Sequence, residues 1–255
     1  MISGKETIRR KSEDELILQK LQSIADDKTI EWTQRKAKEL MRHMTQYKCA
    51  MMEIETRFQL LNEEFAFEYG RVPINSIKTR LKTLQSIKRK VDRRGYPWTP
   101  DSIWENINDI AGVRVVCAFP DDVYTLADSL LKQDDITLIS KKDYIAEPKE
   151  NGYRSLHITV SLPIYLAREK KQVKVEVQLR TIAMDFWASL EHQLRYKSEA
   201  EFTKAMAEEL FLCAQLSAEL DTRMDALRKN VPREEQPFAD PSGDVHQLQL
   251  LFSNH

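Results

Sequence analysis

Apolar residues recur at helical spacing near the start of the chain. Between residues 30 and 69 they follow one another at intervals of three, four or eight: Trp32, Leu40, Met44, Tyr47, Met51, Ile54, Phe58 and Leu61. This period belongs to one face of an α-helix. Neither Gly nor Pro interrupts the stretch before Gly70, so the pattern predicts one long helix or two joined ones over residues 30–69. A shorter helix is expected over residues 13–25.

The middle of the chain alternates between strand and helix patterns. Runs rich in β-branched residues predict strands over residues 74–82, 111–119, 136–144, 153–166 and 172–181. Amphipathic segments predict helices over residues 85–94, 101–106, 121–133, 183–197 and 201–229.

The strand predicted over residues 172–181 has two distinct faces. Its apolar positions are Val173, Val175, Val177 and Leu179, and the polar positions between them are Lys174, Glu176, Gln178 and Arg180. Successive side chains of a strand point to opposite faces, so one face belongs to the core and the other stays polar. A charged turn over residues 168–171 joins this strand to the one before it, and the pair predicts an antiparallel hairpin.

These elements predict an α/β fold, an α+β-like mixed sheet with long helices before and after it. We expect N-terminal helices in residues 1–69, a core in residues 70–197, and a helix and tail in residues 198–255, packed as one compact domain. The last 25 residues carry Pro232, Pro237, Pro241 and Gly243, and we expect them to be irregular.

Composition narrows the classes of protein. The 255 residues include 39 Lys and Arg against 40 Asp and Glu, a net charge of −1, which excludes a globally basic nucleic-acid coat. No apolar run approaches the roughly 18 residues of a membrane-spanning helix, and residues 1–11 lack the apolar stretch of a secretory signal. Three widely spaced cysteines fit the reduced thiols of a cytoplasmic protein.

Charge is uneven along the chain. Residues 78–94 hold eight Lys and Arg against one acid, Asp92, so the net charge is 8 − 1 = +7 over 17 residues. Such a cluster is either a phosphate-binding surface or a solvated helix face, and the segment alone does not separate the two.

Two acids stand at polar strand positions. Asp109 comes just before the strand over 111–119, and Glu176 lies on the polar face of the strand over 172–181. If these strands are neighbours, the carboxylates converge and offer the hard oxygen ligands that Mg²⁺ prefers. From spacing alone, two solvated acids are the simpler interpretation.

Tyr153 and His157 are four residues apart in an extended stretch and are expected on one face.

The combination of motifs resembles the synthetase domain of the RelA/SpoT proteins, which make the alarmones ppGpp and pppGpp. The motifs cover about residues 74–197 and occur in the family's order: Thr79-Arg-Leu-Lys82, Asp109-Ile-Ala-Gly-Val-Arg114, Asn151-Gly-Tyr-Arg-Ser-Leu-His157, Glu176-Val-Gln-Leu-Arg-Thr181 and Phe186-Trp-Ala-Ser-Leu-Glu-His192. The chain lacks the His-Asp motif of the family's hydrolase domain. It is therefore similar to the small alarmone synthetases of the RelP and RelQ types.

The resemblance implies a nucleotidyltransferase-like mixed sheet and a Mg²⁺-dependent pyrophosphokinase of the stringent response. Pyrophosphate would pass from ATP to the 3′-hydroxyl of GDP or GTP, with AMP leaving. Family members of this size form homotetramers, so we expect a homo-oligomer without a membrane or a stable nucleic-acid partner.

The resemblance also assigns roles to residues. The catalytic and metal positions are Asp109 and Glu176, with Glu176 either a metal ligand or the base for the 3′-hydroxyl. The ATP positions are Arg80, Lys82, Ser86, Lys90, Arg93 and Arg114, with Arg94 an alternative to Arg93 and Arg114 stacking on adenine. The guanosine positions are Lys142, Lys149, Tyr153, Arg154, His157, Gln178, Asp185 and Glu191, with Tyr153 stacking on guanine.

Asp185 departs from the pattern, because many relatives, especially RelQ-like ones, carry Asn there. Guanine presents N1–H and N2–H₂ as adjacent donors, and a carboxylate can accept both, so Asp185 could read guanine. This favours a RelP-like member. The alternative is a solvated Asp in the first helical turn, where its charge suits the helix dipole.

Two other functions stay open at this point. Some relatives of the family place pyrophosphate on the 3′ end of tRNA, and they share the ATP-side motifs. A non-enzymatic RNA-binding regulator could use residues 78–94 alone, but it would leave Asp109 and Glu176 unexplained. The net charge of −1 argues against the extended basic surface that a tRNA substrate would need.

Overall fold

A computed structural model describes residues 27–197 and 202–231 of the chain. In chain order its elements are α2 (Asp27–Tyr69), β1 (Ile74–Leu81), α3 (Leu84–Arg94), α4 (Pro100–Asn106), β2 (Ala111–Cys117), α5 (Pro120–Leu131), β3 (Thr137–Asp143), β4 (Leu156–Tyr165), β5 (Lys170–Thr181), α6 (Ile182–Lys197) and α7 (Lys204–Asn230). The helix expected over residues 13–25 and the tail expected after residue 231 lie outside the described residues.

The expectation of a mixed sheet with helical flanks is confirmed. Five strands lie in the order β1-β2-β5-β4-β3, with β2 and β5 parallel and the other neighbouring pairs antiparallel. The predicted hairpin is the β4–β5 pair. The long N-terminal helix is the single helix α2, and by their internal contacts residues 1–45 and 46–255 form two units.

One strand boundary was predicted wrongly. β4 begins at Leu156, three residues later than expected, so Tyr153 lies before the strand. The preceding loop closes on itself, because Gly152 N donates to Lys149 O at 2.8 Å and Lys149 N donates to Tyr153 O at 3.2 Å. Gly152 has a φ of +86°, which extended backbone does not permit.

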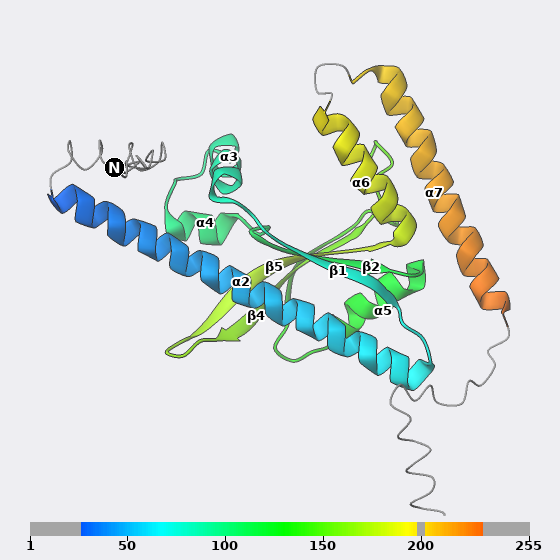
Figure 1. The fold of residues 1–255 in the computed structure, drawn as a ribbon, viewed down its shortest axis with the longest axis horizontal. Helices are drawn as coiled ribbons and strands as arrows, with labels where there is room; N and C mark the ends of the chain where they lie inside the picture. The colour runs from blue at the N-terminus through cyan, green and yellow to red at the C-terminus, as the bar shows by residue number, and fades with distance from the viewer. Residues whose placement is uncertain (1–26, 198–201, 232–255) are drawn as a thin grey trace, which may run out of the picture. The chain divides into compact units, whose positions relative to one another are not determined.

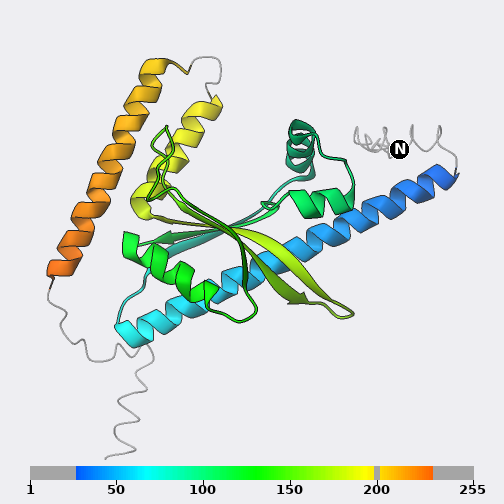
Figure 2. The same ribbon diagram turned by 180° about the vertical axis from the view of Figure 1, so that it is seen from behind.

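The core follows the period-2 pattern of the sheet. The apolar face of β5 is buried along its whole length, as the alternation predicted. Helix α5 packs on β2 and β5, and Figures 1 and 2 show it beside the sheet. The C-terminal part of α2 contributes Ile54 and Phe58 to this core, and Arg57 ties it to the turn after α5 through Gln133 and Asp135.

Helices α6 and α7 form an antiparallel pair at one end of the sheet (Figure 1). Trp187 and Ala188 of α6 pack with Ala214 of α7, and the Trp187 indole donates to the Leu210 carbonyl at 2.8 Å. Within the part of the chain that the structure describes, no helix is long and apolar enough to cross a membrane.

The basic segment, residues 78–94, runs from the end of β1 through the predicted helix α3. The Thr83 hydroxyl caps its first turn by accepting from Ser86 N at 3.2 Å, and Gly95, with a φ of +68°, ends it. Arg93 and Arg94 occupy the last turn, where cations interact favourably with the helix dipole.

An ion pair with a buried carboxylate joins the segment after α2 to α5. Asp122 is 0% exposed and pairs with Arg71. We expect Arg71→Met to lower the free energy of unfolding by about 3 kcal/mol, because it leaves a buried carboxylate unpaired. Urea denaturation followed by circular dichroism measures this. Lys88→Met, which breaks the exposed Lys88–Asp92 pair on α3, is the control and should cost no more than about 0.5 kcal/mol. Equal losses in the two variants would show that the Arg71 pair does not act as a buried one.

Candidate active site

A row of polar side chains crosses the whole sheet, one from each strand. In the pairing register Lys78 of β1 lies opposite Arg114 of β2, and Arg114 lies opposite Gln178 of β5. Gln178 lies opposite His157 of β4, which lies opposite Lys142 of β3. Residues directly opposed across strands share a face of the sheet. The five side chains therefore form one continuous row, called here the polar row.

A second row runs beside the first. Arg80 of β1 lies opposite Gly112 of β2, which lies opposite Glu176 of β5. Gly112 places no side chain between them, and a Cβ built there would only meet the Arg80 carbonyl oxygen at 3.6 Å. No side chain therefore stands on the sheet surface between Arg80 and Glu176. A guanidinium borders this gap on one side and a carboxylate on the other.

Asp109 is held by two lysines. Its Oδ2 accepts from Lys82 Nζ at 2.6 Å and lies 2.7 Å from Lys90 Nζ of α3. Burial alone raises the pKa of the Asp109 carboxyl, but the two ammonium groups outweigh it and hold that pKa below its ordinary value. Its other oxygen, Oδ1, is buried and accepts no hydrogen bond from the described residues. A charged carboxylate with one unsatisfied oxygen fits a hard cation.

Glu176 lies on the strand next to the one that Asp109 precedes, because β2 and β5 pair directly. The sequence predicts that Asp109 and Glu176 converge only if these two strands are neighbours, and they are. Glu176 Oε2 accepts from Gln178 Nε2 at 2.9 Å, and Oε1 lies 3.9 Å from His157 Nδ1. Over residues 27–197 and 202–231, no group of three or more His, Cys, Asp or Glu could hold a metal. Any metal here would therefore take most of its ligands from phosphates and water. Mg²⁺ is usually coordinated in this way.

Asp185 is not the solvated acid of the alternative interpretation. It is 8% exposed in the first turn of α6. Its Oδ1 lies 3.3 Å from both Arg114 and Arg180, and its Oδ2 lies 3.3 Å from Lys78 Nζ. Three cations, one each from β1, β2 and β5, thus converge on one carboxylate.

An aromatic cluster stands at the β4 end of the polar row. Tyr153 Oη lies 2.8 Å from His157 Nε2, although Tyr153 precedes the strand. Lys149 Nζ lies over the Tyr144 and Tyr153 rings, 4.6 and 4.8 Å from their centroids, and Tyr144 meets His157 edge-on at 5.3 Å. The ring faces and the ammonium group form one cationic, aromatic surface.

His157 is neutral at physiological pH. Burial lowers the pKa of its imidazole to about 3, with further lowering by the positive charges of Arg180, Lys149, Lys142 and Arg114. Tyr153 Oη accepts from the Arg180 guanidinium at 2.9 Å, so one hydroxyl contacts both Arg180 and His157 Nε2.

The loop before β4 is anchored on both C-terminal helices. Asn151 Oδ1 accepts from Tyr153 N at 3.2 Å, and Asn151 Nδ2 donates to Glu191 of α6 at 3.3 Å. A Cβ at Gly152 would come within 2.5 Å of the Ala214 Cβ on α7. The Tyr153 ring packs against the cluster around Ala214. The backbone that presents Tyr153 therefore lies directly on α7.

The remaining predicted residues lie at the edges of this surface. The Ser86 hydroxyl accepts from Thr83 Oγ1 at 2.9 Å at the start of α3. Arg80, Lys142, Arg93 and Arg94 are exposed, so burial does not separate Arg93 from its alternative. Arg154 acts electrostatically on Asp221 of α7.

Three contributors were missed by the sequence interpretation: Arg180, Lys78 and Tyr144. Arg180 shares the polar face of β5 with Glu176 and Gln178, so the alternation alone could have drawn attention to it. Lys78 lay inside the basic segment but was given no role. Tyr144 lies just after β3, and nothing in the local sequence links it to His157.

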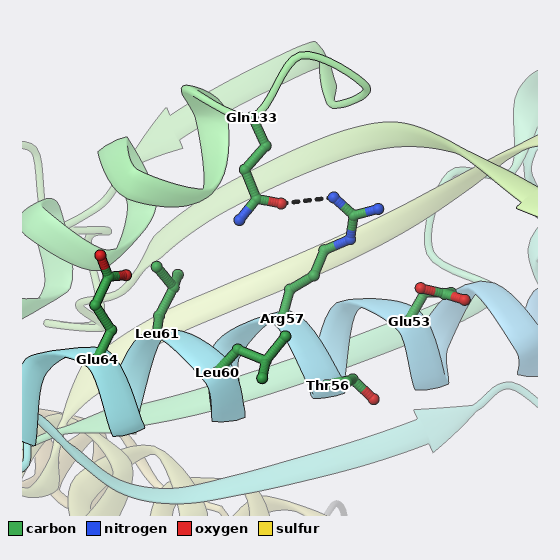
Figure 3. Close-up of a pocket in the computed structure, with 7 residues that line it drawn as sticks. All are labelled: Glu53, Thr56, Arg57, Leu60, Leu61, Glu64 and Gln133. Atoms are coloured by element: carbon green, nitrogen blue, oxygen red, sulfur yellow. Dashed lines mark hydrogen bonds between the residues drawn. The ribbon is translucent and has the colours of Figure 1, made fainter.

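A cavity of about 380 Å³ lies away from this surface, and Figure 3 shows its lining. Its walls are Glu53, Thr56, Arg57, Leu60, Leu61 and Glu64 of α2, with Gln133 after α5. Arg57 spans it by donating to Gln133 at 2.5 Å. None of the predicted site residues lines this cavity, so the candidate site is the polar face of the sheet.

Comparison with known proteins identifies the family. Residues 79–201 match the model described as the region found in RelA / SpoT proteins. The chain is 40% identical over 185 residues to the GTP pyrophosphokinase YwaC of Bacillus subtilis, covering 72% of this chain and 88% of that protein.

Two solved structures from the same organism are similar to it. The small alarmone synthetase 2 has a TM-score of 0.69 at 38% identity, covering 76% of this chain and all of that one. The small alarmone synthetase 1, bound to its product pppGpp, has a TM-score of 0.70 at 34% identity, covering 76% of this chain and 98% of that one. With this sequence, this sheet and these relatives, the chain belongs to the RelA/SpoT family, among its small alarmone synthetases.

Proposed function

We propose that the chain is a GTP pyrophosphokinase that transfers pyrophosphate from ATP to the 3′-hydroxyl of GDP or GTP and releases AMP. The observation that carries the proposal is Asp109, a carboxylate held charged between Lys82 and Lys90 with one oxygen unsatisfied, beside a cationic sheet face. The pyrophosphokinase and the product-bound synthetase among its relatives support the same reaction. ATP and guanosine nucleotides are cytoplasmic metabolites, so we place the reaction in the cytoplasm.

On the ATP side, this chain's cations neutralise phosphate charge. Arg80, Lys82, Ser86, Lys90 and Arg93 are the proposed phosphate-binding residues, and Arg114 the residue that stacks on adenine. Asp109 and Glu176 would hold Mg²⁺, which supplies further neutralisation of the phosphates when bound.

On the guanosine side, base and phosphates meet different groups. Tyr153 stacks on guanine and Asp185 accepts from its N1–H and N2–H₂. Lys142 and Lys149 offer charge to the phosphates, whereas His157, being neutral, offers only a hydrogen bond. The proposed orienting residues are Arg154, Gln178 and Glu191.

Glu176 is proposed for one of two roles, a metal ligand or the base that takes the 3′-hydroxyl proton. A base must reach that hydroxyl with a free oxygen. Oε2 is engaged by Gln178, and Oε1 faces the Nδ1 of His157 at 3.9 Å, which is longer than a hydrogen bond. Oε1 is therefore the oxygen that either role would use.

The reaction is tested with the purified chain, Mg²⁺, ATP and either GDP or GTP. We expect a guanosine product heavier by one pyrophosphate, with AMP as the second product, resolved by anion exchange and mass detection. Asp109→Asn keeps the shape but removes the charge, and should lower kcat by about 100-fold or more. Asp92→Asn on α3 is the matched control and should leave kcat unchanged.

Failure to form a guanosine product from either acceptor would contradict the proposal. ATP consumption and AMP release only when tRNA is supplied would assign the chain to the tRNA-modifying relatives instead.

The loop that presents Tyr153 gives a second prediction. Gly152→Ala should raise the KM for GDP about fivefold and leave the KM for ATP unchanged, because the new methyl group meets Ala214 and the backbone keeps a left-handed φ. Adding Ala214→Gly should restore part of the loss. Gly70→Ala imposes a similar φ, +60°, with open space around it, and is the control. Steady-state kinetics with each substrate varied would contradict this account if Gly70→Ala had the same effect.

The outward side of α7 supports a homotetramer, which we propose as the assembly. Exposed apolar residues follow one another at helical spacing there: Leu212, Leu216, Leu220, Met224 and Leu227. Such a stripe is typical of a surface that another chain covers.

We expect multi-angle light scattering to give four times the chain mass of 29.8 kDa. The double change Leu216→Glu and Leu220→Glu should yield smaller species, because each charge would have to be buried. Lys204→Glu, at the first turn of α7, is the control. A wild-type monomer would contradict the proposed assembly.

A further inference from the structure

Arg180 is a buried cation beneath the guanosine side of the site. It follows Gln178 on the polar face of β5 and is 2% exposed. Burying a guanidinium costs free energy unless its donors are satisfied, and an apolar side chain of similar volume often serves stability as well. The contacts that Arg180 makes therefore indicate why this buried position carries a cation.

Its partners come from three different elements. The guanidinium donates to Tyr153 Oη at 2.9 Å before β4, to Gln178 Oε1 at 3.0 Å on β5, and to Asp185 Oδ1 at 3.3 Å on α6. Its carbon centre lies 5.5 Å from the centroid of the Tyr153 ring. A guanidinium is planar and its donors have fixed directions, so these contacts fix the orientation of the acceptors as well.

The other two cations on Asp185 are placed differently. The side chains of Lys78 and Arg114 are 59% and 36% exposed, whereas that of Arg180 is 3% exposed. Lys78 and Arg114 can therefore turn toward a nucleotide at the surface, while Arg180 stays beneath Tyr153 and Asp185.

Guanine recognition requires these two side chains to keep one relative geometry. The N1–H and N2–H₂ donors lie in the plane of the base, so a carboxylate that accepts them must lie in that plane. A ring that stacks on the base must lie above or below the plane. We propose that Arg180 is the positioning residue that holds the Tyr153 ring and the Asp185 carboxylate in that arrangement and so sets the specificity for guanine. This inference rests on the proposed function, in which Tyr153 and Asp185 contact the base.

The test compares Arg180→Met, which removes the charge at similar length, with Arg180→Lys, which keeps the charge but not the fork of donors. The substrates are GDP and inosine diphosphate, which lacks the N2 amino group. We expect Arg180→Met to raise the KM for GDP about tenfold or more, with the KM for ATP changed less than about twofold. The preference for GDP over inosine diphosphate in kcat/KM should fall toward one. For Arg180→Lys, both the KM for GDP and the preference for GDP should lie between the values for Arg180→Met and the wild type.

A structural role alone predicts a different result. Arg71→Met, which destabilises the fold away from the site, serves as the control and should leave the preference for GDP intact. If Arg180→Met retains that preference, or if it changes the KM values of ATP and GDP in parallel, the inference is wrong.

A second measurement covers the case in which Arg180→Met does not fold. Tyr153→Phe removes only the hydroxyl that Arg180 holds and keeps the ring. Combined with Arg180→Lys, it should change kcat/KM for GDP by less than the product of the two single effects, because both remove the same contact. Independent, multiplicative effects would overturn the inference.

Calorimetric binding of GDP separates this inference from the proposed function. A wild-type chain that binds GDP but forms no product would contradict the proposed reaction, and the Arg180 variants would then be compared by their Kd for GDP and for inosine diphosphate. A chain that forms the product while the variants keep their discrimination would overturn the role of Arg180 alone. A wild-type chain that neither binds GDP nor uses it would overturn both.

Discussion

The parallel pairing of β2 with β5 is the constraint on which the site depends. It sets Gly112 opposite Glu176 and Arg114 opposite Gln178, and so brings together motifs that are far apart in the sequence. Asp109 lies just before one strand and Glu176 within the other. A shift of β5 by one residue would turn Glu176 and Gln178 into the apolar core, so the same hydrophobic burial that stabilises the sheet also fixes the site.

The polar face carries more positive than negative charge, and this shapes the chemistry of its members. Two lysines hold the pKa of the Asp109 carboxyl below its ordinary value, and burial, with a further contribution from nearby cations, lowers the pKa of the His157 imidazole. The positive potential over the sheet contributes to both shifts. Such a surface favours a polyanion such as a nucleoside triphosphate, and it needs its few carboxylates at defined points where a metal or a base can neutralise or orient a bound ligand.

Local pattern predicted most of the elements but not the contacts between them. The period-2 alternation of β5 and the breaks at Gly70 and Gly95 were sufficient for strands and helix ends. The site needed more, because the three cations on Asp185 come from β1, β2 and β5 and their meeting depends on strand order. The start of β4 was predicted too early. The left-handed backbone at Gly152 belongs to a loop, and the pattern of hydrophobic residues carries no information about it.

Helix α7 connects two properties that the sequence treats separately. Its inner side, at Ala214, supports the loop that presents Tyr153, while its outer side carries the exposed apolar stripe. Well-packed side chains transmit displacements rather than absorb them, since interiors are dense and leave few voids. Gly152 leaves no room for a side chain against α7, so a shift of the helix toward the sheet must move the loop. The packing of α7 against Gly152 is therefore one of the contacts that hold the loop and the Tyr153 ring in place.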